Sequence, residues 1–292
     1  GLRGSQMPPR VIRERRAGKY LWDISVHGPS TAITIMKPIR ALDPIEPALI
    51  LPEVRNPKNW IAGKLWYSDK DRFNLLVGLA TMPAFVINTD LVKGREFKSF
   101  KDLLDPKWKG KIIVGRDPRY GGPGYSFFSF LYLNPKLGPD FIRALVKQDL
   151  MVLRNDRQAL DWVGKGKYPI LLGPAETVTR DLIKRGVPIK MVPPQQMREG
   201  GALSSGPASL ALFNRAPHPN AAKVYINWLL SKEGSSQFTR VTGIPSLRVD
   251  APTDHLDSWR IPVQGYFKTL DEAALSKKGA LVAFLHKVLK KK

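Results

Sequence analysis

The chain contains no cysteine, so disulfide bonds, thiolate metal sites and cysteine nucleophiles are all excluded. It also lacks any unbroken run of the roughly 18 to 20 apolar residues that a membrane-spanning helix needs. Acidic residues are few: 25 Asp and Glu stand against 47 Lys and Arg, which leaves a formal net charge of +22 over 292 residues. Because 43% of the residues are hydrophobic, the sequence can build a sizeable core and is not that of a disordered chain.

Motifs that would indicate an enzyme are missing as well. The sequence has no HExxH zinc motif, no GxSxG nucleophile turn, no GxxxxGK[ST] phosphate loop and no GxGxxG after a strand. The four histidines, His27, His218, His255 and His286, do not have the spacing of metal ligands. We therefore expect no catalytic residue, no metal site and no cofactor.

The positive charge is compatible with nucleic acid, an anionic membrane surface or an anionic ligand as a partner. Basic residues are spread over the whole length, with denser groups at residues 10–16 and 290–292. Neither zinc-finger spacing nor an RNA-reading aromatic signature accompanies them. A solvent-exposed basic surface on a globular protein is therefore the simplest interpretation, and no nucleic acid is expected as a partner.

Short apolar runs alternate with amphipathic segments, which predicts α/β units with a largely parallel sheet. Strands are predicted at residues 22–26, 75–89 (two strands, divided at Pro83), 111–115, 151–153, 168–172, 189–192 and 208–213. Helices are predicted from Ser30, Ser99, about Tyr125 and Pro219, and at residues 137–147, 156–164, 175–185 and 275–289. The spacing of Ser99 and Asp102 predicts a capping box at a helix start.

One helix carries an apolar repeat. In the segment that begins at Pro219, intervals of three and four separate Ala221, Tyr225, Trp228 and Leu229. This pattern predicts that they form one buried face of the helix, with Trp228 packed in the core.

Three segments resemble the family 1 extracellular solute-binding proteins, which are the receptors of ABC importers. They are ERRAGKYLWDISV (residues 14–26), SFKDLLDPKWKGKI (residues 99–112) and APHPNAAKVYINWLLSKEGSSQFTRVTGIPS (residues 216–246). Their order and spacing match the family, and the resemblance extends over nearly the whole chain. It implies an α/β fold of the periplasmic-binding-protein type II, in which two lobes close on a ligand around a hinge.

The resemblance also implies a domain organisation. Residues 1–90 would form the first part of lobe 1, residues 91–200 lobe 2, and residues 201–292 a return to lobe 1 followed by C-terminal helices that pack across the lobes. Members of the family begin with a strand and a helix upstream of the segment that matches residues 2–10. We therefore expect the chain to be N-terminally incomplete, with its export signal absent, and the mature protein to be periplasmic or extracellular, with or without a lipid anchor.

The function implied is that of the substrate-binding component of an ABC importer. Its partners would be a small-molecule solute and an ABC transporter permease. Because hinge closure holds the solute without covalent chemistry, the protein is not expected to be an enzyme and needs no cofactor.

Ligands of doubly wound folds lie beyond the carboxyl ends of strands, where helix N-termini favour anions and ligand oxygens. The chain has four turns of this kind, and ordinary helix capping is the alternative role for their polar residues. The candidate ligand-binding residues are Ser5 in the first turn, His27, Ser30 and Thr31 in the second, Arg116, Gly122, Gly124, Tyr125 and Ser126 in the third, and Glu176 and Thr177 in the fourth.

One branch of the family holds ferric iron with an adjacent pair of tyrosines in the second lobe. In the corresponding turn this chain reads GPAETV at residues 173–178, without a tyrosine. Glu176 alone does not replace two phenolates as hard anionic ligands, so a small organic anion becomes the expected cargo and ferric iron the alternative.

Two charged residues leave further alternatives open. Arg116 agrees with an anionic cargo, but a surface ion pair with Asp117 is its other possible role. Glu176 would suit a ligand with an ammonium group, or would complement the dipole of its own helix. Outside the family, the alternative is a charge-driven binder of nucleic acid or of an anionic surface.

Overall fold

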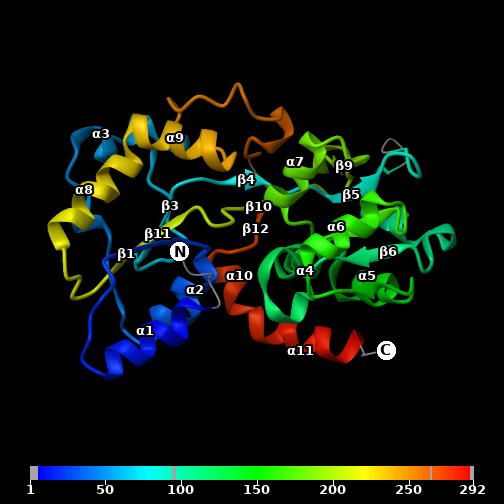
Figure 1. The fold of residues 1–292 in the computed structure, drawn as a ribbon, viewed down its shortest axis with the longest axis horizontal. Coiled ribbons are helices and arrows are strands. Elements are labelled where there is room, and N and C mark those ends of the chain that lie inside the picture. Colours follow the sequence, from blue (N-terminus) through cyan, green and yellow to red (C-terminus); the bar gives the residue numbers. More distant parts are fainter. Residues whose placement is uncertain (1–5, 94–96, 264, 290–292) are drawn as a thin grey trace. The chain divides into compact units, whose positions relative to one another are not determined.

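Figure 1 shows the fold in a computed structural model that describes residues 6–93, 97–263 and 265–289. The chain forms two compact units. Unit 1 consists of Gly1–Ala80, Ser205–Pro262 and Leu270–Leu275, and unit 2 consists of Thr81–Ser204, Val263–Thr269 and Ser276–Lys292. The correspondence of these units to the lobes expected from the resemblance stays a prediction.

The main sheet of unit 1 has β11 (Ser209–Phe213) at its centre. This strand pairs antiparallel with β1 (Ile24–His27), β2 (Leu42–Asp43) and β3 (Asn74–Leu76). The expectation of a largely parallel sheet is therefore wrong for this unit. Sequence periodicity locates strands but carries no direction, and the direction of β11 depends on where the chain re-enters the unit after unit 2.

Helices cover this sheet through a shared apolar cluster. α1 (Met7–Arg16) contributes Met7 and Val11, and the π-helical segment η1 (Ala32–Met36) contributes Met36, which pack with Ala211 and Phe213 of β11. η1 continues the single turn α2 (Pro29–Thr31), so the helix predicted from Ser30 is present and begins one residue earlier.

The end of η1 is anchored by a cluster of ion pairs. The ammonium group of Lys37 lies 2.9 Å from Asp69, 2.7 Å from Asp71 and 3.1 Å from Glu272. Burial would lower the pKa of this lysine, but the three carboxylates outweigh it and raise the pKa well above its usual value. Lys37 thus ties η1 to the loop before β3 and to α10 (Glu272–Ser276).

α8 (Pro219–Leu230) buries a different face from the one predicted. Its buried apolar residues include Ala222, Ile226 and Leu229, whereas Tyr225 and Trp228 are 42% and 41% exposed. The prediction of a buried Trp228 is therefore wrong. α8 carries two apolar stripes with helical spacing, and the repeat alone does not tell which one meets the core.

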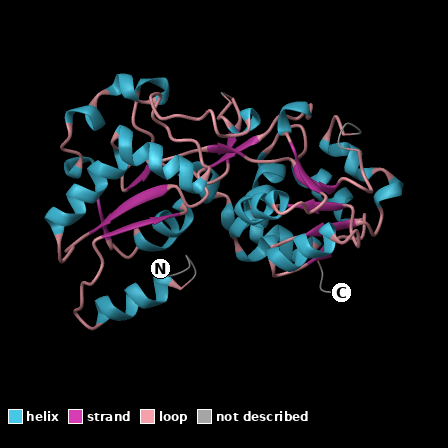
Figure 2. Cartoon of the chain, turned by 45° about the horizontal axis from the view of Figure 1, so that its top comes forward, coloured by secondary structure: helices cyan, strands magenta, loops and turns pink. Residues whose placement is uncertain are grey.

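Unit 2 is built on a five-stranded sheet in the order β7 (Met151–Val152), β6 (Ile112–Val114), β8 (Ile170–Leu172), β5 (Phe85–Asn88) and β9 (Ile189–Val192). β6 is parallel to β7 and β8, while β5 is antiparallel to β8 and β9. In this sheet the parallel expectation therefore holds for the three neighbouring strands β7, β6 and β8. Figure 2 distinguishes the strands from the surrounding helices by colour.

Helices alternate with the strands of this sheet as predicted. α4 (Gly122–Leu133) and α5 (Gly138–Val146) follow β6, α6 (Asp156–Gly164) follows β7, and α7 (Glu176–Lys184) follows β8. The capping box is also confirmed: the side chain of Ser99 accepts from the backbone, and Asp102 accepts from the N–H of Ser99, at the start of the short 3-10 helix η6 (Phe100–Leu104).

The remaining elements include two that differ from their predicted bounds. The predicted pair of strands at residues 75–89 is wrong, because the chain forms β3, β4 (Ala80–Thr81) and β5, with breaks at Gly78 and Pro83. The helix predicted at residues 275–289 is divided into α10 and α11 (Lys278–Val288).

Further elements are α3 (Pro52–Arg55), α9 (Lys232–Thr242), β10 (Ala202–Ser204), β12 (Phe267–Lys268), and the 3-10 turns Glu46–Ala48, Pro57–Asn59, Ile61–Gly63, Pro106–Trp108, Pro118–Tyr120, Pro194–Gln196 and Ser258–Arg260. Among the described residues, no helix has both the length and the apolar character needed to cross a membrane.

Candidate functional site

Three helices of unit 2 begin at the same edge of its sheet. Because β6, β7 and β8 are parallel, their carboxyl ends lie together, and α4, α6 and α7 begin shortly after those ends. Asn155 caps α6 through its side chain, whereas no N-cap side chain bonds to α4 or α7. The first N–H groups of these two helices, with the positive end of each helix dipole, favour an anionic group at this edge.

The third and fourth candidate turns are in backbone contact. A Cβ atom on Gly173, which has a φ of +61°, would lie 2.8 Å from the Cα atom of Gly124. A Cβ atom on Gly124 would lie only 1.9 Å from the carbonyl oxygen of Arg116. The structure therefore brings Arg116, Gly124 and the turn before Glu176 together, and it does so through positions that only glycine can occupy without a shift.

Arg116 stands at this edge with its side chain 44% exposed. One guanidinium nitrogen lies 2.8 Å from a carboxylate oxygen of Asp156, the first residue of α6. The side chain also lies close over Gly122, since a Cβ atom there would be 2.7 Å from Cδ of Arg116. The alternative role of Arg116, a surface ion pair with Asp117, is therefore wrong: Asp156 is the partner of Arg116, and Asp117 binds Arg119 instead.

Asp156 is buried beneath the arginine. Burial raises its pKa, and the charge and hydrogen bond of Arg116 oppose that rise. A buried carboxylate that holds an exposed guanidinium fixes the position of the arginine at the sheet edge.

The remaining candidates of unit 2 differ in their access to solvent. Tyr125 is 2% exposed with its hydroxyl oxygen enclosed, and burial raises the pKa of its phenol. Ser126 is buried as well. Glu176, the first residue of α7, is half-buried, and Thr177 is exposed. A role of these four residues in ligand binding stays a prediction.

The second candidate turn belongs to unit 1. His27 ends β1, and its ring nitrogens are enclosed and have no hydrogen-bond partner among the described residues. Burial lowers the pKa of this imidazole, so it is held as the neutral form. Ser30 and Thr31 are half-buried in the turn α2 that follows. Ser5, the candidate of the first turn, lies outside the described residues.

Sequence reasoning missed Asp156, which the structure places in contact with Arg116. Its only local signal was an acidic residue at a helix start directly after a strand. The two residues meet because β6 and β7 lie side by side in parallel, which is a property of the sheet and not of either segment.

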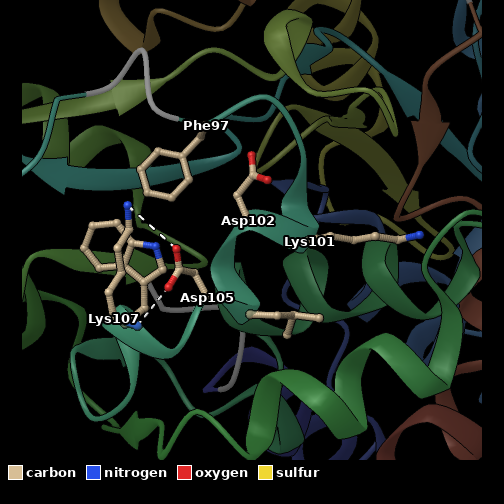
Figure 3. Close-up of a pocket in the computed structure, with 7 residues that line it drawn as sticks. Phe97, Lys101, Asp102, Asp105 and Lys107 are labelled. Atoms are coloured by element: carbon tan, nitrogen blue, oxygen red, sulfur yellow. Dashed lines mark hydrogen bonds and ion pairs between the residues drawn. The ribbon is translucent and has the colours of Figure 1, made fainter.

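A separate cavity of about 460 Å³ lies in unit 2 against the segment at residues 99–112 (Figure 3). Its lining residues are Phe97, Lys101, Asp102, Leu104, Asp105, Lys107 and Trp108. Phe97 stacks on Trp108 with 5.6 Å between ring centroids, and Lys107 lies 3.9 Å from Asp105 and 4.8 Å from the Trp108 ring.

The two carboxylates that line this cavity already accept local backbone hydrogen bonds. Asp102 accepts from the N–H of Ser99 in the capping box, and Asp105 accepts from the N–H of Lys107. Figure 3 shows Lys101 directed away from the paired Asp105 and Lys107. We therefore assign the cavity to the local packing of this segment and place the candidate site at the sheet edge. Elsewhere in the described ranges, no group of three or more His, Asp and Glu side chains is placed to hold a metal ion.

The sequence profile of the family described as bacterial extracellular solute-binding protein matches residues 4–260. The chain belongs to this family, whose members bind solutes and are not enzymes. The class inferred from the three sequence segments is thereby confirmed, while a place in its ferric-binding branch is not. Among curated proteins, no sequence is significantly similar to this chain.

Solved structures of periplasmic binding proteins share the fold. AfuA from Actinobacillus pleuropneumoniae, with exogenous fructose-6-phosphate bound, is 18% identical over 99% of this chain and 88% of its own, with a TM-score of 0.66. Iron-bound HitA from Pseudomonas aeruginosa is 15% identical over 98% and 88%, with a TM-score of 0.69. The Trichodesmium protein IdiA (FutA), in complex with iron and citrate, is 16% identical over 99% and 90%, with a TM-score of 0.72. These likenesses confirm the expected two-lobed α/β fold of the periplasmic-binding-protein type II.

Proposed function

We propose that this protein is the substrate-binding component of an ABC importer. It captures a small organic anion between its two lobes, outside the cytoplasmic membrane, and delivers the anion to the permease. The observation that carries the proposal is the half-exposed Arg116, held by Asp156 at the edge where α4, α6 and α7 begin. A carboxylate, phosphonate or phosphate ester is the chemistry that such an edge recognises.

The arginine is prepared for an anion by its surroundings. A guanidinium has five N–H donors in a fixed fork, and the contact with Asp156 involves one of its nitrogens. The other donors can bind oxygens of a solute in the bidentate geometry that suits carboxylate and phosphoryl groups. The uncapped starts of α4 and α7 add backbone N–H donors to the same region.

The turn of unit 1 would supply the second half of the binding site. A solute that touches both lobes binds the closed state better than the open one, so it shifts the protein toward closure by that difference in affinity. The ring nitrogens of His27 are enclosed, so His27 is proposed to shape this turn rather than to carry a charge. Ser30 and Thr31, which are half-buried, are proposed to contribute hydroxyl groups.

The solved structures include binders of an organic anion and of iron, so the choice of cargo rests on the residues of this chain. AfuA binds fructose-6-phosphate, which is a phosphate ester. HitA binds iron, but the turn after β8 in this chain has no tyrosine that would serve as a phenolate ligand. We therefore favour the organic anion, and we keep ferric citrate in the test.

The proposal is tested by thermal unfolding of the protein with a panel of solutes: fructose 6-phosphate, phosphonoacetate, citrate, glutamate, spermidine and ferric citrate. A ligand at a hundred times its dissociation constant stabilises the native state by about 2.7 kcal/mol, which for a protein of this size raises the melting temperature by roughly 5 to 10 °C. We expect such a shift from one class of anion.

The control pair removes one positive charge in either of two places. Arg116→Gln should weaken binding of the active anion by about tenfold or more, as expected for the loss of a charged hydrogen bond. Arg143→Gln, in an exposed pair with Asp140 on α5, should leave affinity unchanged. A rise in melting temperature with ferric citrate alone would contradict the proposal. So would the absence of a rise with every solute, if heparin raised the melting temperature and added salt removed that effect.

A further inference from the structure

The loop between β6 and α4, residues 115–121, contains a buried ion pair next to Arg116. Asp117 is buried, and Arg119 binds it with two nitrogens: Nε lies 2.8 Å from one carboxylate oxygen and the terminal nitrogen Nη2 lies 2.6 Å from the other. Burial would raise the pKa of Asp117, but the hydrogen bonds and charge of Arg119 outweigh it and lower the pKa. The loop is therefore braced from within by a planar two-point contact.

The same guanidinium reaches the far end of the chain. Its remaining terminal nitrogen, Nη1, donates to the carbonyl oxygen of Leu289 over 2.9 Å, and Leu289 is the residue that ends α11. Carbonyl groups in the last turn of a helix have no partner within the helix, so a cationic donor there is a favourable cap. The side chain of Arg119 is 11% exposed, which shields these bonds from water.

α11 is in turn packed on α4, the helix that starts at the candidate site. Leu281 and Leu285 of α11 are buried, and the ring of Phe284 lies 5.5 Å from that of Tyr132 on α4. The ammonium group of Lys278 lies 5.7 Å from the ring centroid of Tyr125 in the first turns of α4. The C-terminal helix thus contacts both α4 and the loop before it.

We infer that Arg119 is a positioning residue, which uses the C-terminal helix α11 to hold the β6–α4 loop and, through it, the anion-binding Arg116. The expected effect on anion affinity rests on the proposed function. The link between the loop and α11 rests only on the contacts described above. Without the Arg119 side chain, the loop loses both the hydrogen bond to Leu289 and the ion pair with Asp117. Arg116 belongs to this loop, so its guanidinium would no longer be held in one orientation.

The link is tested by amide hydrogen exchange in wild type, Arg119→Gln, Arg119→Lys and the control Arg10→Gln. Arg10 forms an exposed pair with Glu14 in unit 1, so its variant removes the same charge elsewhere. In Arg119→Gln we expect amides at residues 115–126 and at residues 284–289 to exchange about tenfold faster or more, because both segments lose a native contact. Arg10→Gln should change neither segment.

The lysine variant separates the two contacts. A lysine retains the charge beside Asp117 but lacks the fork that also reaches Leu289. Arg119→Lys should therefore keep residues 115–126 close to wild type while residues 284–289 exchange faster. Should Arg119→Gln destabilise the whole unit, the double variant Asp117→Asn with Arg119→Gln removes both charges and should still release both segments.

Anion affinity distinguishes a positioning role of Arg119 from a role in stability alone, because loss of stability by itself leaves the affinity of the folded protein unchanged. Affinity for the panel anion that stabilises wild type is measured at 15 °C, after circular dichroism has shown that each variant is folded. We expect it to fall about tenfold in Arg119→Gln, since a displaced contact group loses affinity even in a folded protein. In Arg119→Gln, faster exchange confined to one of the two segments, or unchanged affinity with both segments released, would overturn the inference. If wild type binds no panel member, the proposed function fails, and the exchange pattern still decides whether Arg119 joins the loop to α11.

Discussion

The two strand-to-helix turns around His27 and Arg116 have similar local sequences and opposite environments. Each follows a strand and leads through glycine and proline into a helix. His27 is enclosed and has neither ring nitrogen in a hydrogen bond among the described residues, whereas Arg116 is half-exposed and bound to a buried carboxylate. The local sequence of such a turn therefore does not determine which charge the turn presents, because its burial depends on the segments that pack over it.

The turns also differ in how closely the backbone approaches their glycines. A Cβ atom on Gly124 would lie 1.9 Å from the carbonyl oxygen of Arg116, whereas one on Gly28 would lie 3.0 Å from that of Gly206. The turn of unit 2 is therefore the more tightly constrained, as suits one that positions a charged side chain.

The largest expected effect comes from filling that space. Gly124→Ala places a methyl group against backbone, which cannot move aside like a side chain, and should lower the free energy of unfolding by about 3 kcal/mol. Gly28→Ala should cost about 1 kcal/mol, because a small shift relieves the contact. Urea unfolding followed by circular dichroism measures both, and equal losses would remove the distinction between the turns.

A second test concerns the anchor of η1, the helical segment that follows the His27 turn. Lys37 is 18% exposed and binds three carboxylates, so Lys37→Met leaves them to repel one another and should cost about 2 kcal/mol. Lys165→Met, which breaks an exposed pair with Asp161, should cost less than about 0.5 kcal/mol. Thermal unfolding of both variants shows whether the unit 1 turn depends on this anchor.

The environment of His27 predicts a response to acid. Its pKa is lowered in the folded state, so below the unfolded value of about 6.5 the unfolded chain binds a proton that the folded protein does not. Stability is therefore full above pH 6.5 and falls as the pH drops toward the folded pKa, by at most about 1.4 kcal/mol per pH unit. His27→Phe should remove this part of the slope between pH 6.5 and 5. A slope that is the same in both proteins would mean that His27 is not enclosed in solution.

Asp156 predicts a pH dependence of the opposite sign, because burial raises its pKa against the opposing charge and hydrogen bond of Arg116. Its folded pKa lies above the unfolded value of about 3.9, so its contribution is present below that pH and is lost as the pH rises through the folded pKa. Asp156→Asn should abolish this loss and, at neutral pH, weaken binding of the panel anion by freeing Arg116. Unfolding measured from pH 3 to 7, beside anion affinity at pH 7, checks both results. A variant with wild-type affinity would show that Asp156 does not hold the arginine.

Local features of the fold were predictable from sequence. α6 occupies the predicted residues 156–164, β9 the predicted residues 189–192, and the Ser99–Asp102 capping box is formed. These depend on side-chain periods and on hydrogen bonds between near neighbours, which a sequence records directly. The second, third and fourth candidate turns, which lie within the described residues, were predicted at the starts of α2, α4 and α7 for the same reason.

The family and several local elements, among them α6, β9 and the Ser99–Asp102 capping box, follow from the sequence alone. Only the tertiary structure decided the antiparallel direction of β11, which stripe of α8 is buried, that Asp156 holds Arg116, and that Arg119 reaches Leu289. Each of these depends on segments distant in sequence that meet through strand register and chain return. A period of two or of 3.6 residues says that a face is apolar or polar, but the partner of that face is fixed only when the chain is folded.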